Sequence, residues 1–397
     1  MADGALAGIK VLDLSTLYPA PLLAAMLGDL GADVVKVEPP SGDPIRRVGA
    51  LAGGEPRAHR YANRNKRSIA VDPATDDGRA LLAALTSVAD VVVVNQTDAQ
   101  LGRWGCTCDE IAARNPGAVV VSLTAFGRTG PWAERGGNGS IAEGFGGFAF
   151  LNGAADGPPT LPSLALGDTL GAIVALNGVL AALMWRASPA GNGRGQLVDA
   201  SLAESVLTLL GATFAGWRSG EPVPERLGSR IAHATPRNVY RTVDDRYVVV
   251  SAPTDAQVGR VLTLLGITDD DVRARFATAA ARTGAVADEL DERVATWIAA
   301  RSLADALEAL DGARLPCAPV QTLDDLLADA QLVARTSLVP LGDGDGDGDG
   351  DRDRTYVPAP HPQLSRTPAT IRTRGRAEPG ADTDEVLAAW LPTRTDG

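Results

Sequence analysis

Few residues in this sequence are of the types that carry covalent or metal chemistry. The chain has three Cys and three His, and Cys106 and Cys108 form a C-x-C pair without a second pair at a zinc-like spacing. Buried or idle thiols are the better interpretation, and no metal site is expected. Asp168 differs, because its carboxylate opens the long apolar segment of residues 168–185. At a helix start it can cap the helix, or it can be kept ionised and in place as a nucleophile.

Basic side chains are concentrated in one part of an acidic chain. The net charge is −12, from 37 basic and 49 acidic residues, so nucleic acid and anionic membranes are not expected partners. Any anionic ligand therefore needs a local basic site. The densest basic segment contains Arg60, Arg64, Lys66 and Arg67 with Asn63 and Asn65, and Arg46 and Arg47 lie nearby in the sequence. Such a segment either holds phosphates through charge-assisted hydrogen bonds or is a solvated basic loop.

The elements that would position these residues alternate between strands and helices. Short β-branched runs predict strands over residues 8–14, 32–38, 68–71, 90–95 and 118–123. Apolar periodicity predicts helices over residues 21–30, 78–87 and 108–113. Continuous apolar strands between helices are typical of a parallel sheet covered on both faces, which predicts an α/β fold with a Rossmann-like order.

This order commonly binds dinucleotides, but the glycine pattern does not support that function here. The first strand-to-helix turn, residues 14–21, contains no glycine and so lacks the G-x-G-x-x-G fingerprint. A near match at Gly144, Gly146 and Ala149 follows a predicted helix instead of a strand. An NAD-dependent dehydrogenase is therefore disfavoured.

The second half of the chain predicts a long core helix and a separate smaller α/β domain. Residues 168–185 are marginally short for a bilayer span, and a buried helix is the better interpretation. After the turn at residues 192–196, residues 197–210 predict a helix or a strand followed by a helix. Residues 240–251 predict a hairpin, and helices are expected over residues 255–265 and 286–300.

Both ends of the chain carry further signals. The alternating Gly and Asp of residues 342–351 cannot bury a core and predict a solvated, flexible loop; they lack the spacing and the glutamate of an EF-hand calcium site. The first 15 residues lack a charged segment followed by an apolar run, so they are not a secretory signal. We expect a cytoplasmic protein.

Six segments, in this order, carry a family resemblance: GIKVLDLS, LGADVVKVEPP, NRNKRSIAVD, FGRTGPW, GRGQLVDASL and TDEVL. Together they resemble the family III CoA-transferases, the group that includes the α-methylacyl-CoA racemases, over about residues 7–387. The resemblance implies a large Rossmann-like domain built from residues 1–215 and 331–397, a small α/β domain at 225–330, and an interlocked homodimer.

The resemblance also assigns the chemistry. The A-L-G-D pattern ending at Asp168 matches the catalytic aspartate of the formyl-CoA transferase branch. Its carboxylate would attack an acyl-CoA thioester to form a mixed anhydride, and CoA thiolate would convert this to an aspartyl-CoA thioester. The substrates would be an acyl-CoA and a small carboxylic acid, with no permanently bound cofactor. Tyr18 stands where formyl-CoA transferases carry glutamine; its hydroxyl donates to the thioester oxygen or its ring packs.

The remaining site residues follow from the same resemblance. Lys66, Asn95 and Arg103 match CoA-contacting positions, and Lys36, Arg46, Asn65 and Arg67 join them as neighbouring cofactor-binding candidates. Asn138 and Gly139 replace a tyrosine–glutamate pair, and with Gly146 they are expected to line the substrate pocket. Residues 94–99 lack the arginine and aromatic that the family usually has there.

Two alternatives stay within the family. A racemase needs an acid and a base on opposite faces of the α-carbon, but the matching positions here are Asn138, Gly139 and Thr254, which do not exchange protons near neutral pH. A non-catalytic CoA-binding subunit of a heteromeric transferase is the other alternative, against which the presence of Asp168 argues.

Overall fold

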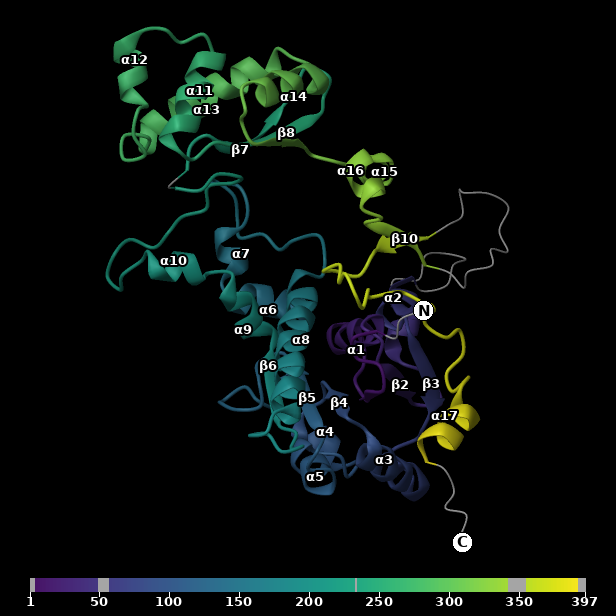
Figure 1. Ribbon diagram of the computed structural model, residues 1–397. Coiled ribbons are helices and arrows are strands. Elements are labelled where there is room, and N and C mark those ends of the chain that lie inside the picture. Colours follow the sequence, from purple (N-terminus) through teal and green to yellow (C-terminus); the bar gives the residue numbers. More distant parts are fainter. Residues whose placement is uncertain (1–3, 49–56, 233, 342–354, 392–397) are drawn as a thin grey trace. The chain divides into compact units, whose positions relative to one another are not determined.

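The computed structural model describes residues 4–48, 57–232, 234–341 and 355–391 (Figure 1). The chain divides into two compact units. The first comprises Met1–Phe148, Leu161–Arg218 and Ala334–Gly397, and the second comprises Ala149–Thr160 and Ser219–Val333. Residues 149–160 thus group with the second unit, whereas the sequence placed them in the large domain. The Gly/Asp loop expected at 342–351 lies outside the described residues.

A six-stranded parallel sheet forms the centre of the first unit. Its strands are β1 (Lys10–Asp13), β2 (Asp33–Glu38), β3 (Lys66–Ala70), β4 (Val91–Val94), β5 (Val119–Thr124) and β6 (Leu197–Ser201). They lie in the order β3-β2-β1-β4-β5-β6, and every neighbouring pair is parallel. The predicted α/β class with a parallel sheet is confirmed. The strand order reverses direction between β1 and β4, and ligands of open α/β sheets bind outside the carboxyl ends of strands at such a point.

Helices cover both faces of this sheet, which explains why its strands are apolar on both sides. On one face lie α1 (Pro19–Asp29), α6 (Gly139–Phe145), α8 (Leu166–Ala187) and α9 (Leu202–Thr208). On the other face lie α3 (Asp76–Val88), α5 (Cys108–Arg114) and α17 (Thr383–Trp390). Residues 197–210 form a strand followed by a helix, so β6 extends the sheet that the sequence predicted.

The C-terminal segment returns to the edge of this sheet. The amide of Asp382 donates to the carbonyl of Ser68, while its carboxylate accepts from the Ser68 amide at 2.8 Å. Trp390 is buried in the core between the sheet and the helices α3 and α5, and its indole N–H donates to Asp33 at 2.8 Å. These contacts attach α17 beside β3, far from its position in the sequence (Figure 1).

The first unit contains several shorter elements around the sheet. They are the 3₁₀ helix η1 (Pro44–Arg47), the helices α2 (Arg57–Ala62), α4 (Asp98–Gly102) and α10 (Gly211–Ala215), and the strands β10 (Leu338–Pro340) and β11 (Tyr356–Pro358). The boundary between the units falls within two helices, α7 (Phe148–Leu151) and α16 (Ala330–Ala334). The sequence predicted none of these short segments, because a few residues carry too little periodicity to be recognised.

The second unit has an antiparallel sheet and its own core. Its strands β7 (Arg237–Arg241), β8 (Tyr247–Ser251) and β9 (Cys317–Pro319) pair in that order. Its remaining helices are α11 (Asp255–Leu264), α12 (Asp270–Arg275), α13 (Gly284–Ala299), α14 (Leu303–Gly312) and α15 (Leu323–Ala328). The predicted hairpin is confirmed as β7–β8, and the helices predicted at 255–265 and 286–300 as α11 and α13.

Helix α8 satisfies the length and hydropathy criteria for a membrane span, and within the described part of the chain it alone does so. It packs against α1, α6, α9 and the strands β5 and β6. One side of α8 thus packs in the core, but only 33% of its most apolar 18 residues is buried, so it is not the fully buried helix that the sequence predicted.

Candidate active site

Two loops meet at the point where the strand order reverses. The loop after β1 carries Thr16, and Asn95 directly follows β4. The amide of Thr16 donates to Asn95 Oδ1 at 2.9 Å, and Asn95 Nδ2 donates back to the Thr16 carbonyl at 2.8 Å. Gln96 Nε2 donates to the Leu14 carbonyl at 2.9 Å. The predicted site residue Asn95 is therefore brought to the loop that leads into Tyr18, where it fixes the backbone.

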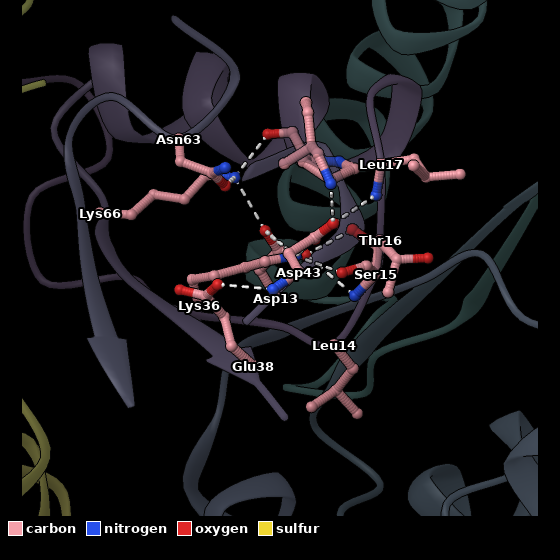
Figure 2. Close-up of polar contacts among 12 residues, drawn as sticks. Asp13, Leu14, Ser15, Thr16, Leu17, Lys36, Glu38, Asp43, Asn63 and Lys66 are labelled. Carbon is pink, nitrogen blue, oxygen red and sulfur yellow. Dashed lines mark hydrogen bonds and ion pairs between the residues drawn. The ribbon is translucent and has the colours of Figure 1, made fainter. Parts of the chain in front are cut away.

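A buried cluster of two lysines and two aspartates lies beneath this loop, as Figure 2 shows. Lys66 Nζ is 2.8 Å from Asp13 Oδ2, and Lys36 Nζ is 2.9 Å from Asp43 Oδ2 and 3.7 Å from Asp13 Oδ2. All four side chains are almost completely buried. The parallel register places Asp13 beside Lys36, so the sheet itself assembles the cluster.

The charges in this cluster stabilise one another. Burial alone would raise the pKa of Asp13, but Lys36 and Lys66 outweigh this effect and hold it below its usual value. Burial would likewise lower the pKa of Lys36, yet Asp13 and Asp43 raise it. For Lys66 burial dominates and lowers the pKa to about 8 despite the attraction of Asp13. Each buried charge in the cluster is thus paired with at least one opposite charge.

Three members of the cluster, Asp13, Lys36 and Asp43, also form hydrogen bonds with the adjoining loop (Figure 2). Asp13 Oδ1 accepts from the amide of Ser15 at 3.0 Å, and Lys36 Nζ donates to the Ser15 carbonyl. Asp43 Oδ1 accepts from the amide of Leu17 at 3.1 Å. Leu17 has a φ of 66°, which a leucine adopts only when its surroundings impose it. The cluster therefore fixes the backbone immediately before Tyr18.

These contacts require a correction for Lys36 and Lys66, which we expected to bind CoA phosphates. Lys66 Nζ donates to Asp13, to the Pro21 carbonyl at 2.7 Å and to Asn63 Oδ1 at 2.9 Å. An ammonium group has three N–H donors, so these partners use all of them. Both lysines lie inside the protein, and we reassign them from phosphate binding to holding the loop.

Three other predicted CoA-binding residues also have internal partners. Arg46 pairs with Glu38 through two contacts of 2.7 Å, and Arg67 bonds to Asp33 at 2.7 Å. Asn65 donates to Asp29 at 2.8 Å and accepts from the amide of residue 372 at 2.7 Å. Asn65 and Arg67 thus hold the edge of the sheet and the returning C-terminal segment.

Exposed cations occur nearby instead. A cavity of about 460 Å³ is lined by Arg46, Arg47, His59 and Arg60 together with backbone around Gly375. Arg47 is exposed, and so is the predicted residue Arg103 at the end of α4. The basic segment that the sequence singled out thus borders two cavities, since Asn65, Lys66 and Arg67 line a second one of about 320 Å³ together with residues 372, 373 and 376.

Asp168 lies in the first turn of α8 and is half-buried. It does not cap its own helix, since Ala165 occupies the N-cap position without a side-chain hydrogen bond. Its Oδ1 instead accepts from the amide of Gly139, the first residue of α6, at 2.8 Å. Burial and the charge of Glu143 raise the pKa of Asp168, and the Gly139 N–H opposes the shift.

Glu143 was not predicted as a site residue. It lies on α6, is 1% exposed, and its Oε1 accepts from the amide of Gly167 on α8 at 2.8 Å. The only signal in the sequence is a carboxylate in the otherwise apolar stretch SIAEGFGGFAF. A surface helix position explains such a residue equally well, so the contact with α8 could not be foreseen.

Gly139 is fixed by its contact with Asp168. A Cβ added at this position would lie 2.7 Å from Asp168 Cγ and 2.8 Å from Asp168 Oδ2. Asn138 caps α6, because its Oδ1 accepts from the amide of Ile141 at 3.2 Å. Gly146 ends the same helix, where a Cβ would lie 2.8 Å from Val206 Cγ1. Gly146 thus packs closely against Val206, and its place in the substrate pocket stays a prediction.

Tyr18 comes close to this group from the start of α1. Its hydroxyl interacts electrostatically with Thr169, the residue after Asp168, and with Asp168 itself. Burial raises the pKa of Tyr18, and the charges of Tyr61 and Asp168 act in the same direction. The two predicted catalytic residues are thus neighbours in space. No cluster of three metal-ligating side chains occurs among the residues that the structure describes.

Similarity to known proteins extends over both units. The family model for CoA-transferase family III matches residues 6–384. A succinyl-CoA–D-citramalate CoA-transferase of Chloroflexus aurantiacus is 33% identical over 380 residues, which cover 93% of this chain and 90% of the relative. The beta subunit of a succinyl-CoA–L-malate CoA-transferase of the same organism is 33% identical over 97% of this chain and 94% of its own. The crystal structure of a CAIB/BAIF family protein from Brucella suis superposes with a TM-score of 0.80 at 29% identity, covering 98% of this chain and all of the other.

Proposed function

The chain belongs to CoA-transferase family III, and on this premise we propose that it moves CoA from an acyl-CoA thioester to a carboxylic acid through covalent intermediates on Asp168. The observation that carries the proposal is the placement of this carboxylate. It is half-buried at the junction of α6 and α8, its pKa is raised, and one oxygen is held by the Gly139 N–H. A carboxylate of higher pKa is the better nucleophile, and a fixed one has less orientational entropy to lose.

The reaction proceeds by four acyl exchanges. A carboxylate oxygen of Asp168 bonds to the thioester carbonyl carbon, and the C–S bond breaks to release CoA thiolate and leave a mixed anhydride. The thiolate then bonds to the aspartyl carbonyl carbon, which releases the donor acid and leaves an aspartyl-CoA thioester. The acceptor carboxylate then attacks the aspartyl-CoA thioester, which releases CoA thiolate and leaves a second mixed anhydride. The thiolate attacks the acceptor's carbonyl carbon in this anhydride, which forms the new acyl-CoA and regenerates the Asp168 carboxylate.

Two neighbours can stabilise the negative charge that develops in these steps. The Gly139 N–H already donates to an Asp168 oxygen at 2.8 Å, which becomes the carbonyl oxygen of the aspartyl adducts. It is then placed to stabilise the oxyanion when thiolate or carboxylate attacks. Tyr18 keeps its proton at neutral pH because its pKa is raised, so its hydroxyl can donate to the thioester oxygen.

We assign the CoA phosphates to cations at the same edge of the sheet. Arg47 and Arg60 line the cavity of about 460 Å³ beside β2, and Arg103 follows β4. Guanidinium groups bind phosphate oxygens through charge-assisted hydrogen bonds. Asn95 joins them as the residue that orders the loop between these cations and Tyr18.

The names of two relatives indicate which substrates to test first. Both are succinyl-CoA transferases that act on a hydroxylated dicarboxylic acid. We therefore propose succinyl-CoA as donor and a small dicarboxylic acid as acceptor, with no permanently bound cofactor, in the cytoplasm. We also propose a Rossmann-like large domain that both chain ends build, and an interlocked homodimer. Exposed apolar side chains on α8 and α10, such as Met184, Trp185 and Phe214, support the association of chains.

The decisive experiment compares Asp168→Asn with a matched exposed aspartate, Asp109→Asn. Succinyl-CoA is incubated with a panel of carboxylic acids, and the new CoA thioesters are measured by mass. We expect Asp168→Asn to abolish exchange and Asp109→Asn to retain it. Hydroxylamine should modify Asp168 only after succinyl-CoA is added to the wild type. Exchange by Asp168→Asn at the wild-type rate would refute the mechanism.

The match to a beta subunit raises a second candidate, a chain that needs an unlike partner. The purified chain alone separates the two possibilities. We expect it to catalyse exchange without addition of another protein, because it contains the candidate nucleophile and its hydrogen-bond donor. A chain that binds CoA but exchanges nothing in the full substrate panel would favour the heteromeric enzyme.

A further inference from the structure

We propose that Glu143 is a positioning residue for the nucleophile: it holds the first turn of α8, and its negative charge favours the covalent forms of Asp168 over the free carboxylate. The proposal rests on the function proposed above, since it takes Asp168 as the group that becomes acylated. It adds a residue that the sequence motifs did not assign, and it states a role that can be separated from folding.

The first support is a reciprocal pair of hydrogen bonds between two helix starts. Asp168 of α8 accepts from the amide of Gly139 on α6, and Glu143 of α6 accepts from the amide of Gly167 on α8. Both distances are 2.8 Å. Each helix therefore supplies a carboxylate to the other's unpaired N–H groups, and each carboxylate is fixed by the helix that it does not belong to.

The second support is how closely the two backbones approach. A Cβ at Gly167 would lie 2.7 Å from the Gly139 carbonyl oxygen, and a Cβ at Gly139 would lie 2.7 Å from both the amide nitrogen and Cγ of Asp168. Only glycine fits at either position without a shift. The junction is therefore rigid, and Glu143 holds Asp168 by fixing the peptide that immediately precedes it.

The third support is the choice of a carboxylate where a neutral side chain would suffice. Thr75, Thr97 and Thr107 satisfy helix-start amides elsewhere in the chain with hydroxyl oxygens. Glu143 is buried instead, and its Oε2 accepts no hydrogen bond from the residues that the structure describes. Burial of an incompletely paired carboxylate is costly. A cap alone does not explain that cost.

The electrostatic consequence acts on Asp168. Burial and the Glu143 charge raise the pKa of Asp168, while the Gly139 N–H from α6 lowers it. From α1 the Tyr18 hydroxyl is coupled to the same carboxylate, and Arg64 and Tyr61 act in turn on Tyr18. A nearby negative charge disfavours the ionised form of Asp168, so Glu143 makes the free Asp168 carboxylate less stable and more nucleophilic.

The reaction relieves this repulsion. When an Asp168 oxygen bonds to the thioester carbon and the C–S bond breaks, the negative charge departs with the thiolate. The anhydride and the aspartyl-CoA thioester are both uncharged at Asp168, so Glu143 no longer opposes them. The step needs no reactant besides the thioester and the enzyme, because the electron pair that forms the C–O bond comes from the carboxylate.

The test uses Glu143→Gln, which keeps an oxygen for the Gly167 amide and removes the charge. Its control is Glu110→Gln, since Glu110 also accepts a helix-start amide at 2.8 Å but lies on α5. Single-turnover formation of the hydroxylamine-trapped adduct is measured against pH. We expect Glu143→Gln to lower the neutral-pH rate roughly three- to tenfold and to move the acid limb to lower pH by up to about one unit, with KM for succinyl-CoA unchanged. Glu110→Gln should match the wild type.

A second pair of variants protects the test from a folding defect. Glu143→Asp and Glu143→Asn share the same shortened side chain and differ in charge. We expect the acid limb of Glu143→Asp to stay near that of the wild type, and the limb of Glu143→Asn to move. Equal acid limbs in both pairs would overturn the role of the charge while leaving Asp168 as the nucleophile. Turnover by Asp168→Asn would instead remove the proposed function itself.

Discussion

Replacing Gly139 with alanine should misplace Asp168, the proposed nucleophile, while leaving its carboxyl group intact. The backbone at Gly139 is not in the left-handed region, so alanine carries no conformational penalty there. The new methyl group would lie 2.7 Å from both the nitrogen and Cγ of Asp168. Ordinary contacts begin near 3.4 Å, so Asp168 must move by roughly 0.7 Å relative to Gly139.

A displacement of this size has two measurable effects. A misplacement of about 1 Å costs on the order of 100-fold in rate, so we expect kcat to fall about 10- to 100-fold with a smaller change in KM. Strain in a packed junction costs about 1–3 kcal/mol of unfolding free energy. The rate is measured as CoA exchange from succinyl-CoA, and the stability by denaturant unfolding.

The same helix offers a matched control. Gly144 also lies in α6, but a Cβ there would meet nothing within 4 Å. Gly144→Ala should keep the wild-type rate and gain up to about 1 kcal/mol, because alanine is the better helix former. Wild-type turnover by Gly139→Ala would refute the inferred contact between α6 and Asp168. Equal loss in both variants would show that α6 tolerates no change, independently of Asp168.

Three further predictions concern charge and proton transfer. Arg46 and other partners lower the pKa of Glu38 to about 2 from 4.5, so its contribution of up to about 3 kcal/mol should be present above pH 4.5 and disappear as the pH falls towards 2; acid unfolding of Glu38→Gln should lack this dependence. Lys66→Met should destabilise the fold by up to about 3–5 kcal/mol, because buried Asp13 loses its nearer cation and retains Lys36 at 3.7 Å. Arg47→Ala should raise KM for the CoA ester without lowering Tm; a rise in KM with an unchanged Tm for Lys66→Met would support phosphate binding by Lys66. Acyl-CoA incubated with the enzyme in deuterated water should keep its α-hydrogen, and rapid deuteration without an acceptor acid would support the racemase instead.

The absence of proton exchange is expected from the positions that a racemase would use. Asn138 caps α6, and Thr254 forms a capping box with Gln257 at the start of α11. Both side chains thus have a structural role in their own helices. Neither an amide nor a hydroxyl is a base near neutral pH. The sequence-based argument against racemisation therefore gains a structural explanation for these two residues.

The strands were predictable because their signal is local. The predicted strands at 90–95 and 118–123 contain the continuous apolar runs 91–94 and 118–121, as expected of parallel strands buried on both faces, and they correspond to β4 and β5. The helix from 168 was also recognised, although α8 begins at Leu166. Short elements such as α6 were missed, since seven residues rich in glycine and small side chains have no helical signature of their own.

The error about the lysines has a different origin. Basic residues close together in sequence were expected to share one surface, but a strand directs successive side chains to opposite faces. Lys66 therefore reaches inward to Asp13, while Arg67 on the same strand bonds to Asp33 at the sheet edge. The partner of Lys66 is 53 residues away in sequence and is brought near by the register of three strands. Neither the composition nor the spacing of residues in the sequence predicts that register.

Asp168 and Glu143 mark the limit of what sequence reasoning reached at the site. Asp168 was identified through the A-L-G-D pattern, because one aspartate before an apolar helix reads equally well as a cap. Its distinguishing contact is with Gly139, 29 residues away, and Glu143 contacts Gly167 across 24 residues. Both bonds exist because α6 and α8 meet at two glycines that leave no room for side chains. The position of the proposed nucleophile is thus set by a helix junction, at which two glycines let the backbones of α6 and α8 touch.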